Sequence, residues 1–542
     1  MPAFSNPKLR RIGALLLFCC LLAPTFYLIA NNQDLPLFGY PHDDGLYFVS
    51  AKSLAGGNGY RIESLPGQPF QTKYPPGLPT YLSIAWLLNP NFPENLQQVS
   101  WLQAVWLPLF LALALWHWRD WGFTGWRRWL LAAVLATSTY VIYFTVTAMS
   151  ELPFAVFLLL TFLLLRLAER DPERATRWML TAGLVAGIAF LFRTAGMVLL
   201  ASVPILLWLQ QRLRDAKWFV AAVLPSVLGW TLWSMTHQPS GSDVIMLYYT
   251  KYLGYHLSVF HLAEAHLFFW VNFDSLLAGI GGLILPTVIP GMIAHIASQL
   301  MGVAALVGIS RMWRRDAARD YTLFGLLFCL MMIAWSFPPN ERFVVPLAPL
   351  IWAGFVTEVL HLATAIRKKM QDRDMGQRVA AGLIGVVGVL LLALIGDLQY
   401  ELRYEILPQL MQQERARLAS DREAYGWIRA NLPEQAPLQA GYDTVEYLYT
   451  GRPAASLISP VTYFYHQDEP GRIAYLSKAP EISRSVGLKY IYVSPNDYRS
   501  DMDPEYKVKL RDNIAKSNDL DVLKTFRGGT LYQIRETARA AR

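Results

Sequence analysis

The chain has 542 residues, of which 54% are hydrophobic and only 16% are charged. Its net charge of +8 would suit a nucleic-acid-binding protein, but Lys and Arg gather in short segments between long apolar runs, the distribution that orients a membrane protein. The three cysteines, Cys19, Cys20 and Cys329, all lie inside apolar runs, so they provide neither a metal-ligand spacing nor a disulfide framework. The composition therefore predicts a polytopic α-helical membrane protein and argues against a nucleic-acid partner.

Apolar runs long enough to cross about 30 Å of hydrocarbon predict about 11 membrane spans. The first run, 12–30, follows a basic segment and lacks a small-residue cleavage site, so we expect a retained span. The next spans are predicted to end near Trp118, Met149, Arg166, 192, 210 and 237. The long apolar stretch to Ser310 should cross the membrane once, with its remainder re-entrant or along the surface. The last spans are predicted to end near Phe337, Arg367 and 396. Basic residues on alternate loops predict a cytoplasmic N-terminus and an extracytoplasmic C-terminus.

The first predicted outer loop, 31–97, carries the adjacent carboxylates Asp43 and Asp44. A helix is predicted over Leu46–Leu54, because a glycine-rich segment follows it, and either aspartate could cap that helix. The run Gly77–Leu88 is apolar but too short to cross, which favours a helix at the membrane interface. Paired carboxylates in a loop are commonly only solvated, but a chain with so few charges makes this pair a candidate for chemistry.

Four more isolated charged residues fall on the predicted outer side: Lys73, Glu151, Arg193 and Arg342. For each cation, contact with lipid headgroups is the alternative to a specific role. The outer segment 237–274, rich in Tyr, His and Phe, is a candidate for closing over a bound substrate. We predict a membrane domain over 1–396 and an extracytoplasmic α/β domain over 397–542, with a strand at Tyr490–Val493 and a helix over Pro504–Ser517.

The order of several motifs resembles the C-fold (GT-C) glycosyltransferases, in particular the branch of protein O-mannosyltransferases and bacterial aminoarabinose transferases. The motifs that carry the resemblance are the acidic pair, the Ala-x-x-Leu-x-x-Gly-x-Gly-Tyr run at 51–60, Lys-Tyr-Pro-Pro-Gly at 73–77, Ser-Glu-Leu-Pro at 150–153, Phe-Arg-Thr-Ala-Gly at 192–196, Arg-Phe-Val-Val-Pro-Leu-Ala-Pro at 342–349, Trp-Ile-Arg-Ala-Asn-Leu-Pro at 427–433 and Tyr-Thr-Gly-Arg at 449–452. They extend over nearly the whole chain.

The resemblance implies a GT-C fold and an inverting transfer of a sugar from a polyprenyl-phosphate carrier to an acceptor hydroxyl on the outer face. It implies that Asp43 is the base, with Asp44 as its orienter or as the second candidate. A free Asp has a pKa near 3.9, so its carboxylate can accept a proton at neutral pH. Lys73, Arg193 and Arg342 are then expected to bind the donor phosphate, and Glu151 is a second acidic site.

One position departs from the family pattern. In the aminoarabinose-transferase branch the residue before this lysine is a glutamate that helps to bind a metal, whereas here it is Thr72. No metal site is therefore predicted, although His42, Glu151 and the histidines at 256, 261 and 266 could supply ligands.

Two other functions remain as alternatives. A transporter or flippase of a lipid-linked sugar should show paired repeats and ionisable residues at mid-membrane depth, and neither is visible in the sequence. An oligosaccharide ligase of the O-antigen type would also use a polyprenyl carrier, but arginines rather than an acidic pair would stand at its centre. The sequence names neither the sugar nor the acceptor, which could be a lipid, a glycan or a protein.

Overall fold

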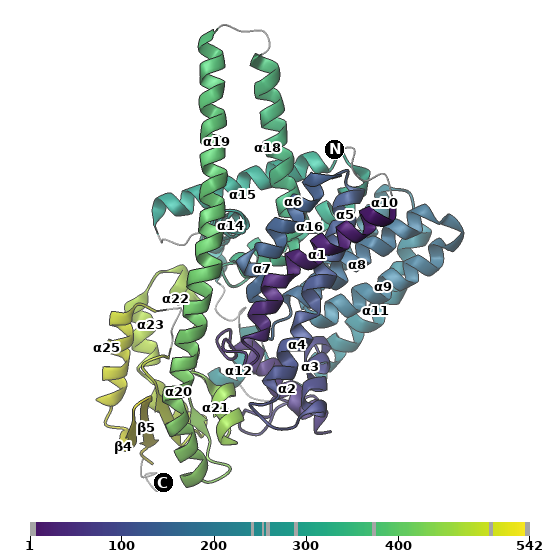
Figure 1. Ribbon diagram of the computed structural model, residues 1–542. Coiled ribbons are helices and arrows are strands. Elements are labelled where there is room, and N and C mark those ends of the chain that lie inside the picture. The colour runs from purple at the N-terminus through teal and green to yellow at the C-terminus, as the bar shows by residue number, and fades with distance from the viewer. Residues whose placement is uncertain are drawn as a thin grey trace. The chain divides into compact units, whose positions relative to one another are not determined.

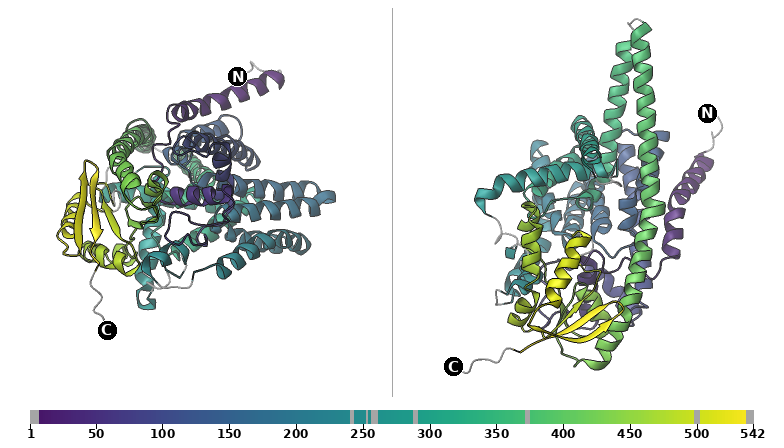
Figure 2. Two further views of the ribbon diagram at one scale, coloured as in Figure 1. Left: turned by 90° about the horizontal axis from the view of Figure 1, so that it is seen from below. Right: turned by 90° about the vertical axis from the view of Figure 1, so that its left-hand side faces the viewer.

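The computed structural model describes residues 7–239, 243–251, 254–255, 261–286, 291–370, 375–497 and 502–536. Packing divides the chain into two compact units, each assembled from separate stretches of sequence (Figures 1 and 2). Unit 1 comprises Met1–Gln33, Ser100–Gly229 and Phe269–Gln409, and unit 2 comprises Asp34–Val99, Trp230–Phe268 and Leu410–Arg542. The predicted functional boundary between 396 and 397 stays a prediction; residue 397 itself lies inside a long helix.

Unit 1 is helical. Its helices are α1 (Pro7–Ala30), α5 (Trp106–Asp120), α6 (Trp126–Thr137), α7 (Thr139–Tyr143), α8 (Glu151–Arg170), α9 (Ala175–Phe192), α10 (Val198–Leu209), α15 (Met292–Met312), α16 (Arg319–Ile333), α17 (Glu341–Val344), α18 (Ala348–Met370) and α19 (Met375–Glu401). Four helices contain residues of both units: α4 (Leu96–Ala104), α11 (Leu213–Thr236), α14 (Ala265–Gly282) and α20 (Leu407–Asn431). The most extensive packing joins α15 to α18, α8 to α9 and α5 to α8. Leu, Ala and Phe side chains fill these contacts, so the bundle is held by apolar packing.

Eight helical segments of the described residues are long and apolar enough to cross a membrane. They are Pro7–Ala30, Leu96–Asp120, Glu151–Arg170, Pro172–Phe192, Leu213–Thr236, Met292–Met312, Glu341–Lys368 and Ile384–Asn431. The third predicted span coincides with the shorter helices α6 and α7. The predicted number of about 11 spans stays a prediction.

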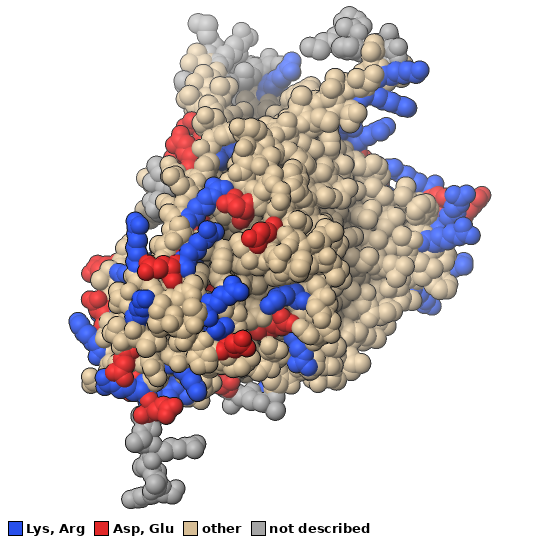
Figure 3. Space-filling view, turned by 60° about the horizontal axis from the view of Figure 1, so that its bottom comes forward, with Lys and Arg blue, Asp and Glu red and all other residues tan. Residues whose placement is uncertain are grey.

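The surface of α19 is strongly apolar. Val387, Val389 and Leu390 each expose more than half of their side chains, and Figure 1 shows α19 beside α18 along much of its length. In Figure 3, Lys, Arg, Asp and Glu are interspersed over one part of the surface, while a broad neighbouring area carries none of them. Exposed aliphatic side chains of this density are typical of a surface that faces lipid.

Unit 2 contains a five-stranded sheet in its described residues, with the strand order β2-β1-β3-β5-β4. The strands are β1 (Leu438–Gln439), β2 (Ala454–Ala455), β3 (Tyr490–Val493), β4 (Leu520–Phe526) and β5 (Gly529–Ile534). β1 pairs in parallel with β2 and β3, and β5 pairs antiparallel with β3 and β4. The accompanying helices are α2 (Asp43–Ala55), α3 (Gly77–Leu88), α12 (Val244–Thr250), α20 (Leu407–Asn431), α21 (Asp443–Thr450), α22 (Thr462–Tyr465), α23 (Glu469–Leu476), α24 (Ala479–Ser485) and α25 (Pro504–Ala515).

One apolar core joins the three stretches of unit 2. It contains Leu46 from α2, Ile62 from the following loop, Tyr249 from α12, and Ile491 and Tyr532 from the sheet. The segment that follows the first span therefore folds together with the C-terminal part of the chain. The acidic pair belongs to this folded unit.

The start of α2 corrects one prediction. The helix begins at Asp43, three residues before the predicted start, and its N-cap is His42, so neither aspartate caps it. Asp43 and Asp44 instead fill the first turn, where the helix dipole favours negative charge. The predicted stop is confirmed: the helix ends at Ala55, and Gly57 and Gly59 follow with positive φ.

Gly45 brings α2 close to α21, since a Cβ atom at position 45 would lie 2.1 Å from Thr444 Oγ1 and 2.8 Å from Thr444 Cβ. We expect Gly45→Ala to lower the free energy of unfolding by about 1 to 3 kcal/mol, the usual effect of overpacking. Thermal unfolding of the purified protein measures it. Gly426→Ala is the matched control, because a Cβ at that α20 position meets nothing within 4 Å. Equal unfolding temperatures for the two variants would contradict the close approach.

Candidate functional site

Asp43 lies at the start of α2 and is partly buried. The hydroxyl of Tyr74 donates a hydrogen bond to Asp43 Oδ1 at 2.5 Å. The Tyr74 ring packs against Tyr47, with 4.8 Å between ring centroids. The carboxylate is therefore held in one direction by a rigid aromatic side chain, as a positioned proton acceptor requires.

Lys73 is buried, with 7% of its surface exposed. Its Nζ lies 3.7 Å from the centroid of the Tyr248 ring and 5.1 Å from that of Tyr74. Gln71 Oε1 accepts hydrogen bonds from the backbone N–H groups of Lys73 and Tyr74, and Thr72 Oγ1 donates to the Thr250 carbonyl at 2.6 Å. These bonds and the prolines at 75 and 76 fix the segment that carries Lys73 and Tyr74 within unit 2.

Asp44 is fully buried. Its two carboxylate oxygens accept backbone hydrogen bonds from Gly39 at 3.0 Å and Gly45 at 2.8 Å. Burial raises the pKa of Asp44 to about 7, and the two hydrogen bonds only partly oppose this shift. Asp44 closes the loop in front of α2, and this geometry suits an orienting role.

The raised pKa of Asp44 predicts a pH dependence of stability. The folded protein binds this proton more tightly than the unfolded chain, so the stabilisation from Asp44 is complete below pH 3.8 and is lost as the pH rises through about 7. We expect the unfolding temperature of the wild type to fall relative to that of Asp44→Asn between pH 5 and pH 7.5. The difference between the two proteins isolates Asp44, and a difference independent of pH would contradict the shift.

The other predicted residues, Glu151, Arg193 and Arg342, meet in unit 1. Glu151 is the first residue of α8 and is fully buried. Arg193 Nη1 and Arg342 Nε each lie 2.6 Å from Glu151 Oε1. The Arg193 guanidinium also lies 5.7 Å from the centroid of the Phe343 ring. Two guanidinium groups thus share one carboxylate oxygen, which fixes their positions.

The structure groups the predicted residues in two sets: Asp43, Asp44 and Lys73 in unit 2, and Glu151, Arg193 and Arg342 in unit 1. Sequence reasoning did not assign roles to Tyr74 and Tyr248, which hold Asp43 and Lys73. Tyr74 belongs to the quoted Lys-Tyr-Pro-Pro-Gly motif, so a signal for it existed. Tyr248 is distant in sequence, and its only signal was its place in the Tyr-rich segment 237–274.

The sequence offers His42 and Glu151 as candidate metal ligands. Among the described residues, no three His, Cys, Asp or Glu side chains are grouped so that they could hold a metal ion. The His42 Nε2 atom lies 3.0 Å from Asp443 Oδ1, and Glu151 is engaged by two arginines. His256 and parts of the segment 237–274 lie outside the described residues.

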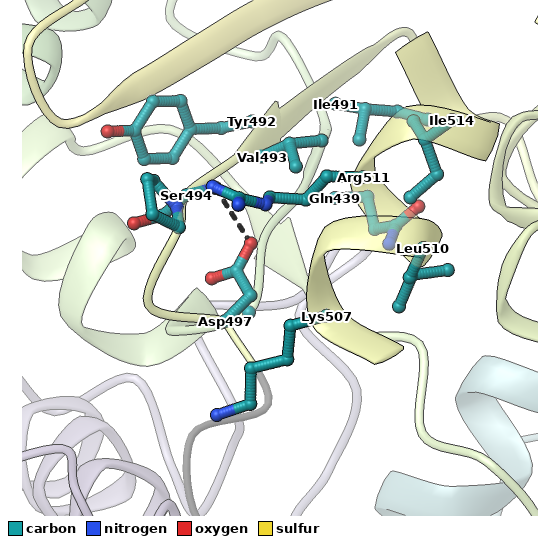
Figure 4. A pocket seen from close by; sticks show the side chains of 12 residues that line it. Gln439, Ile491, Tyr492, Val493, Ser494, Asp497, Lys507, Leu510, Arg511 and Ile514 are labelled. Carbon is teal, nitrogen blue, oxygen red and sulfur yellow. Dashed lines mark hydrogen bonds between the residues drawn. The ribbon is translucent and has the colours of Figure 1, made fainter. Parts of the chain in front are cut away.

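A small pocket lies beside the sheet, at the carboxyl ends of β1 and β3 (Figure 4). Asp497 accepts a hydrogen bond from the Ser494 backbone N–H at 2.9 Å, and burial raises the pKa of Asp497 to about 7. A Cβ on Gly441 would lie 2.3 Å from Asp497 Oδ1. The turn after β3 is therefore closely packed against Gly441, and Asp497 closes it.

Comparison with protein-family models and with curated proteins finds no match. Among solved structures, the chain is similar to ArnT from Cupriavidus metallidurans bound to undecaprenyl phosphate, with 15% identity, coverage of 96% of this chain and 98% of that one, and a TM-score of 0.52. The apo state of the same ArnT gives 13% identity, 90% and 93% coverage, and a TM-score of 0.44. An oligosaccharyltransferase from Archaeoglobus fulgidus gives 14% identity, 83% and 65% coverage, and a TM-score of 0.47.

The first of these similarities extends over nearly the full length of both chains, and at this level of identity it defines the fold. Together with the long apolar helices of unit 1, this similarity identifies the class of protein to which the fold belongs. The protein is a polytopic α-helical membrane protein with the GT-C fold and a small α/β portion, as the sequence predicted.

Proposed function

We propose that this protein is an inverting glycosyltransferase that moves a sugar from a polyprenyl-phosphate carrier to an acceptor hydroxyl. In this proposal the site faces the outer side of the cell (inner or plasma) membrane, with the N-terminus in the cytoplasm and the C-terminal domain outside. The acceptor is a lipid, a glycan or a protein.

The observation that carries the proposal is the arrangement of Asp43, Tyr74 and Lys73 in a protein of this fold. A carboxylate is fixed by a 2.5 Å hydrogen bond from Tyr74, and the Nζ atom of the buried Lys73 lies 5.1 Å from the centroid of the same tyrosine ring. A lysine ammonium group in a site with little water can bind an anionic group through strong charge-assisted hydrogen bonds. A donor phosphate is an anion of the required kind.

The chemistry needs one base. A glycosidase uses two carboxyl groups, because its alkoxide leaving group must be protonated. A phosphate, whose second pKa is about 6, leaves without that proton. The acceptor oxygen attacks the anomeric carbon, the bond from that carbon to the phosphate oxygen breaks with its electron pair going to the phosphate, and the hydroxyl proton passes to Asp43.

We assign Lys73 of unit 2 as a contact of the donor phosphate, and the phosphate-binding roles that the resemblance implies for Arg193 and Arg342 stay a prediction. Each charge-assisted hydrogen bond to the phosphate is expected to contribute about 1.5 to 3 kcal/mol. Glu151 is assigned a positioning role, because both guanidinium groups contact its Oε1 atom. Asp44 is assigned as the orienter of the loop that carries Asp43.

The experiment is a transfer assay with the purified protein in lipid vesicles. Radiolabelled sugars on undecaprenyl phosphate are offered with lipid, glycan and peptide acceptors, and the label is followed into product. We expect label transfer with release of undecaprenyl phosphate. Movement of intact donor between leaflets without bond cleavage would instead indicate a flippase, and activity only with a diphosphate-linked oligosaccharide would indicate an O-antigen-type ligase.

A further inference from the structure

His42, directly before Asp43, has an unusual backbone conformation. Its φ is +65°, a region that L-residues with a full side chain rarely adopt. Such strain persists only where the surrounding structure fixes it, and it is frequent at functional sites. The contacts of the His42 ring show what fixes it in unit 2.

The ring is held by a buried chain of hydrogen bonds. His42 Nε2 lies 3.0 Å from Asp443 Oδ1 at the start of α21. Asp443 is fully buried, and its Oδ2 accepts a hydrogen bond from the Tyr249 hydroxyl at 2.7 Å. The Tyr249 oxygen in turn accepts the backbone N–H of Ser456 at 2.9 Å. Each member therefore has its orientation set by the next.

This series of hydrogen bonds also fixes the tautomer of His42. A carboxylate only accepts hydrogen bonds, so the proton of the neutral imidazole must be on Nε2. The Nδ1 atom then carries a lone pair, and it is buried without a hydrogen-bond partner among the described residues. A buried acceptor without a partner costs free energy, which is explained if it receives a proton during the reaction.

The groups around the ring favour the imidazolium. Burial opposes its charge, but the charge and hydrogen bond of Asp443 outweigh burial and raise the pKa of His42 above 6.5. Among the neighbours, Asp43 adds to this effect and Lys73 opposes it. The ring centroids of Tyr248 and Tyr249, both in α12, lie 6.1 and 6.0 Å from that of His42. The imidazolium is therefore next to α2, α12 and α21.

We propose that His42 is the second proton acceptor of the site, positioned by Asp443 and Tyr249, and that it takes the proton which Asp43 has removed from the acceptor hydroxyl. The inference rests on the proposed transferase function. The proton moves from the acceptor oxygen to the Asp43 carboxylate and then to His42 Nδ1, giving an imidazolium paired with Asp443. Release of the proton to solvent restores neutral His42 and ionised Asp43. The C-terminal part of the chain thus supplies a positioning residue, Asp443, to the acidic site.

The test measures kcat/KM for transfer from radiolabelled undecaprenyl-phosphate sugars as a function of pH, with a chelator present throughout. Only neutral His42 can accept a proton, so the wild-type rate should rise with pH through the pKa of His42. His42→Gln should lower the rate by about 10²-fold and remove that rise. Asp443→Asn should move the rise to lower pH, because the carboxylate that favours the imidazolium is gone.

His466→Gln is the matched control. His466 also pairs with an acid in unit 2, Glu264 at 3.2 Å, but the His466 side chain is 43% exposed, and we expect an unchanged rate and pH profile. The inference would be overturned if His42→Gln had the same pH profile of kcat/KM as the wild type. It would also be overturned if the rate fell but still rose with pH as in the wild type. Full activity in Asp43→Asn would instead overturn the base assignment of the proposed function.

A second measurement covers the case in which His42→Gln does not fold. The chain has nine histidines, and each gives an NMR signal when the imidazole carbons are labelled. One signal should titrate above pH 6.5 in the wild type and move to lower pH in Asp443→Asn. If Asp443→Asn shifts no histidine titration, His42 is not coupled to Asp443 and the inference fails.

Discussion

Asp43→Asn is expected to lower kcat for sugar transfer by about 10²- to 10⁴-fold, the usual contribution of a positioned general base. Asparagine has nearly the shape of aspartate and can still accept the hydrogen bond from Tyr74, which lies 2.5 Å from Asp43 Oδ1. It cannot take up a proton from the acceptor hydroxyl. We therefore expect the affinity for the polyprenyl carrier, measured by binding of labelled undecaprenyl phosphate, to change little while kcat falls.

Asp34→Asn is the control for this substitution. Asp34 lies on the same segment, but its side chain is exposed and pairs with Arg415 at 2.6 Å. An exposed pair of this kind contributes about 0 to 1 kcal/mol to stability, and we expect normal transfer in the variant. If Asp43→Asn kept full activity, Asp43 would not be the base; if Asp43→Asn and Asp44→Asn both kept it, the mechanism itself would be wrong.

Glu151→Ala is expected to have the largest effect on the stability of the protein. It removes a fully buried carboxylate and leaves Arg193 and Arg342, each 2.6 Å from its Oε1, without this partner. Removing one member of a buried ion pair costs about 3 to 5 kcal/mol, because the remaining charge stays desolvated. We expect a strongly lowered unfolding temperature for the protein in detergent or nanodiscs.

The matched control in unit 1 is Asp274→Asn. Asp274 pairs with His295 at 2.9 Å, but the two side chains are 52% and 45% exposed, so we expect a change below about 1 kcal/mol. Equal unfolding temperatures for Glu151→Ala and Asp274→Asn would show that the two arginines find other partners. That result would remove the positioning role of Glu151.

The local sequence pattern was sufficient to predict the bounds of several helices and strands. The helix Gly77–Leu88 and the strand Tyr490–Val493 have the predicted bounds, and the helix predicted over Pro504–Ser517 runs from Pro504 to Ala515. Each has its start or end set by neighbouring residues, such as Pro at a helix start. The predicted start of α2 was wrong: the helix begins at Asp43, and its N-cap residue His42 contacts Asp443 some 400 residues along the chain.

The sequence indicated the candidate residues one by one, through their charge and through the motifs that contain them, but it did not indicate which of them meet. That Glu151, Arg193 and Arg342 meet at one oxygen, or that Lys73 lies against Tyr248, depends on helices packed from distant parts of the chain. No periodicity or motif contains this information. Tertiary packing alone determines which side chains meet.

The sequence by itself determined the class of protein. Three features can be seen without any tertiary contact: the length of the apolar runs, the distribution of Lys and Arg, and the order of the motifs. The tertiary structure alone decided that Asp43 begins a helix that shares the apolar core of unit 2 with the sheet, that Tyr74 donates a hydrogen bond to Asp43, and that His42 pairs with Asp443. The physical reason is that side-chain orientation, burial and charge partners arise from contacts between segments hundreds of residues apart.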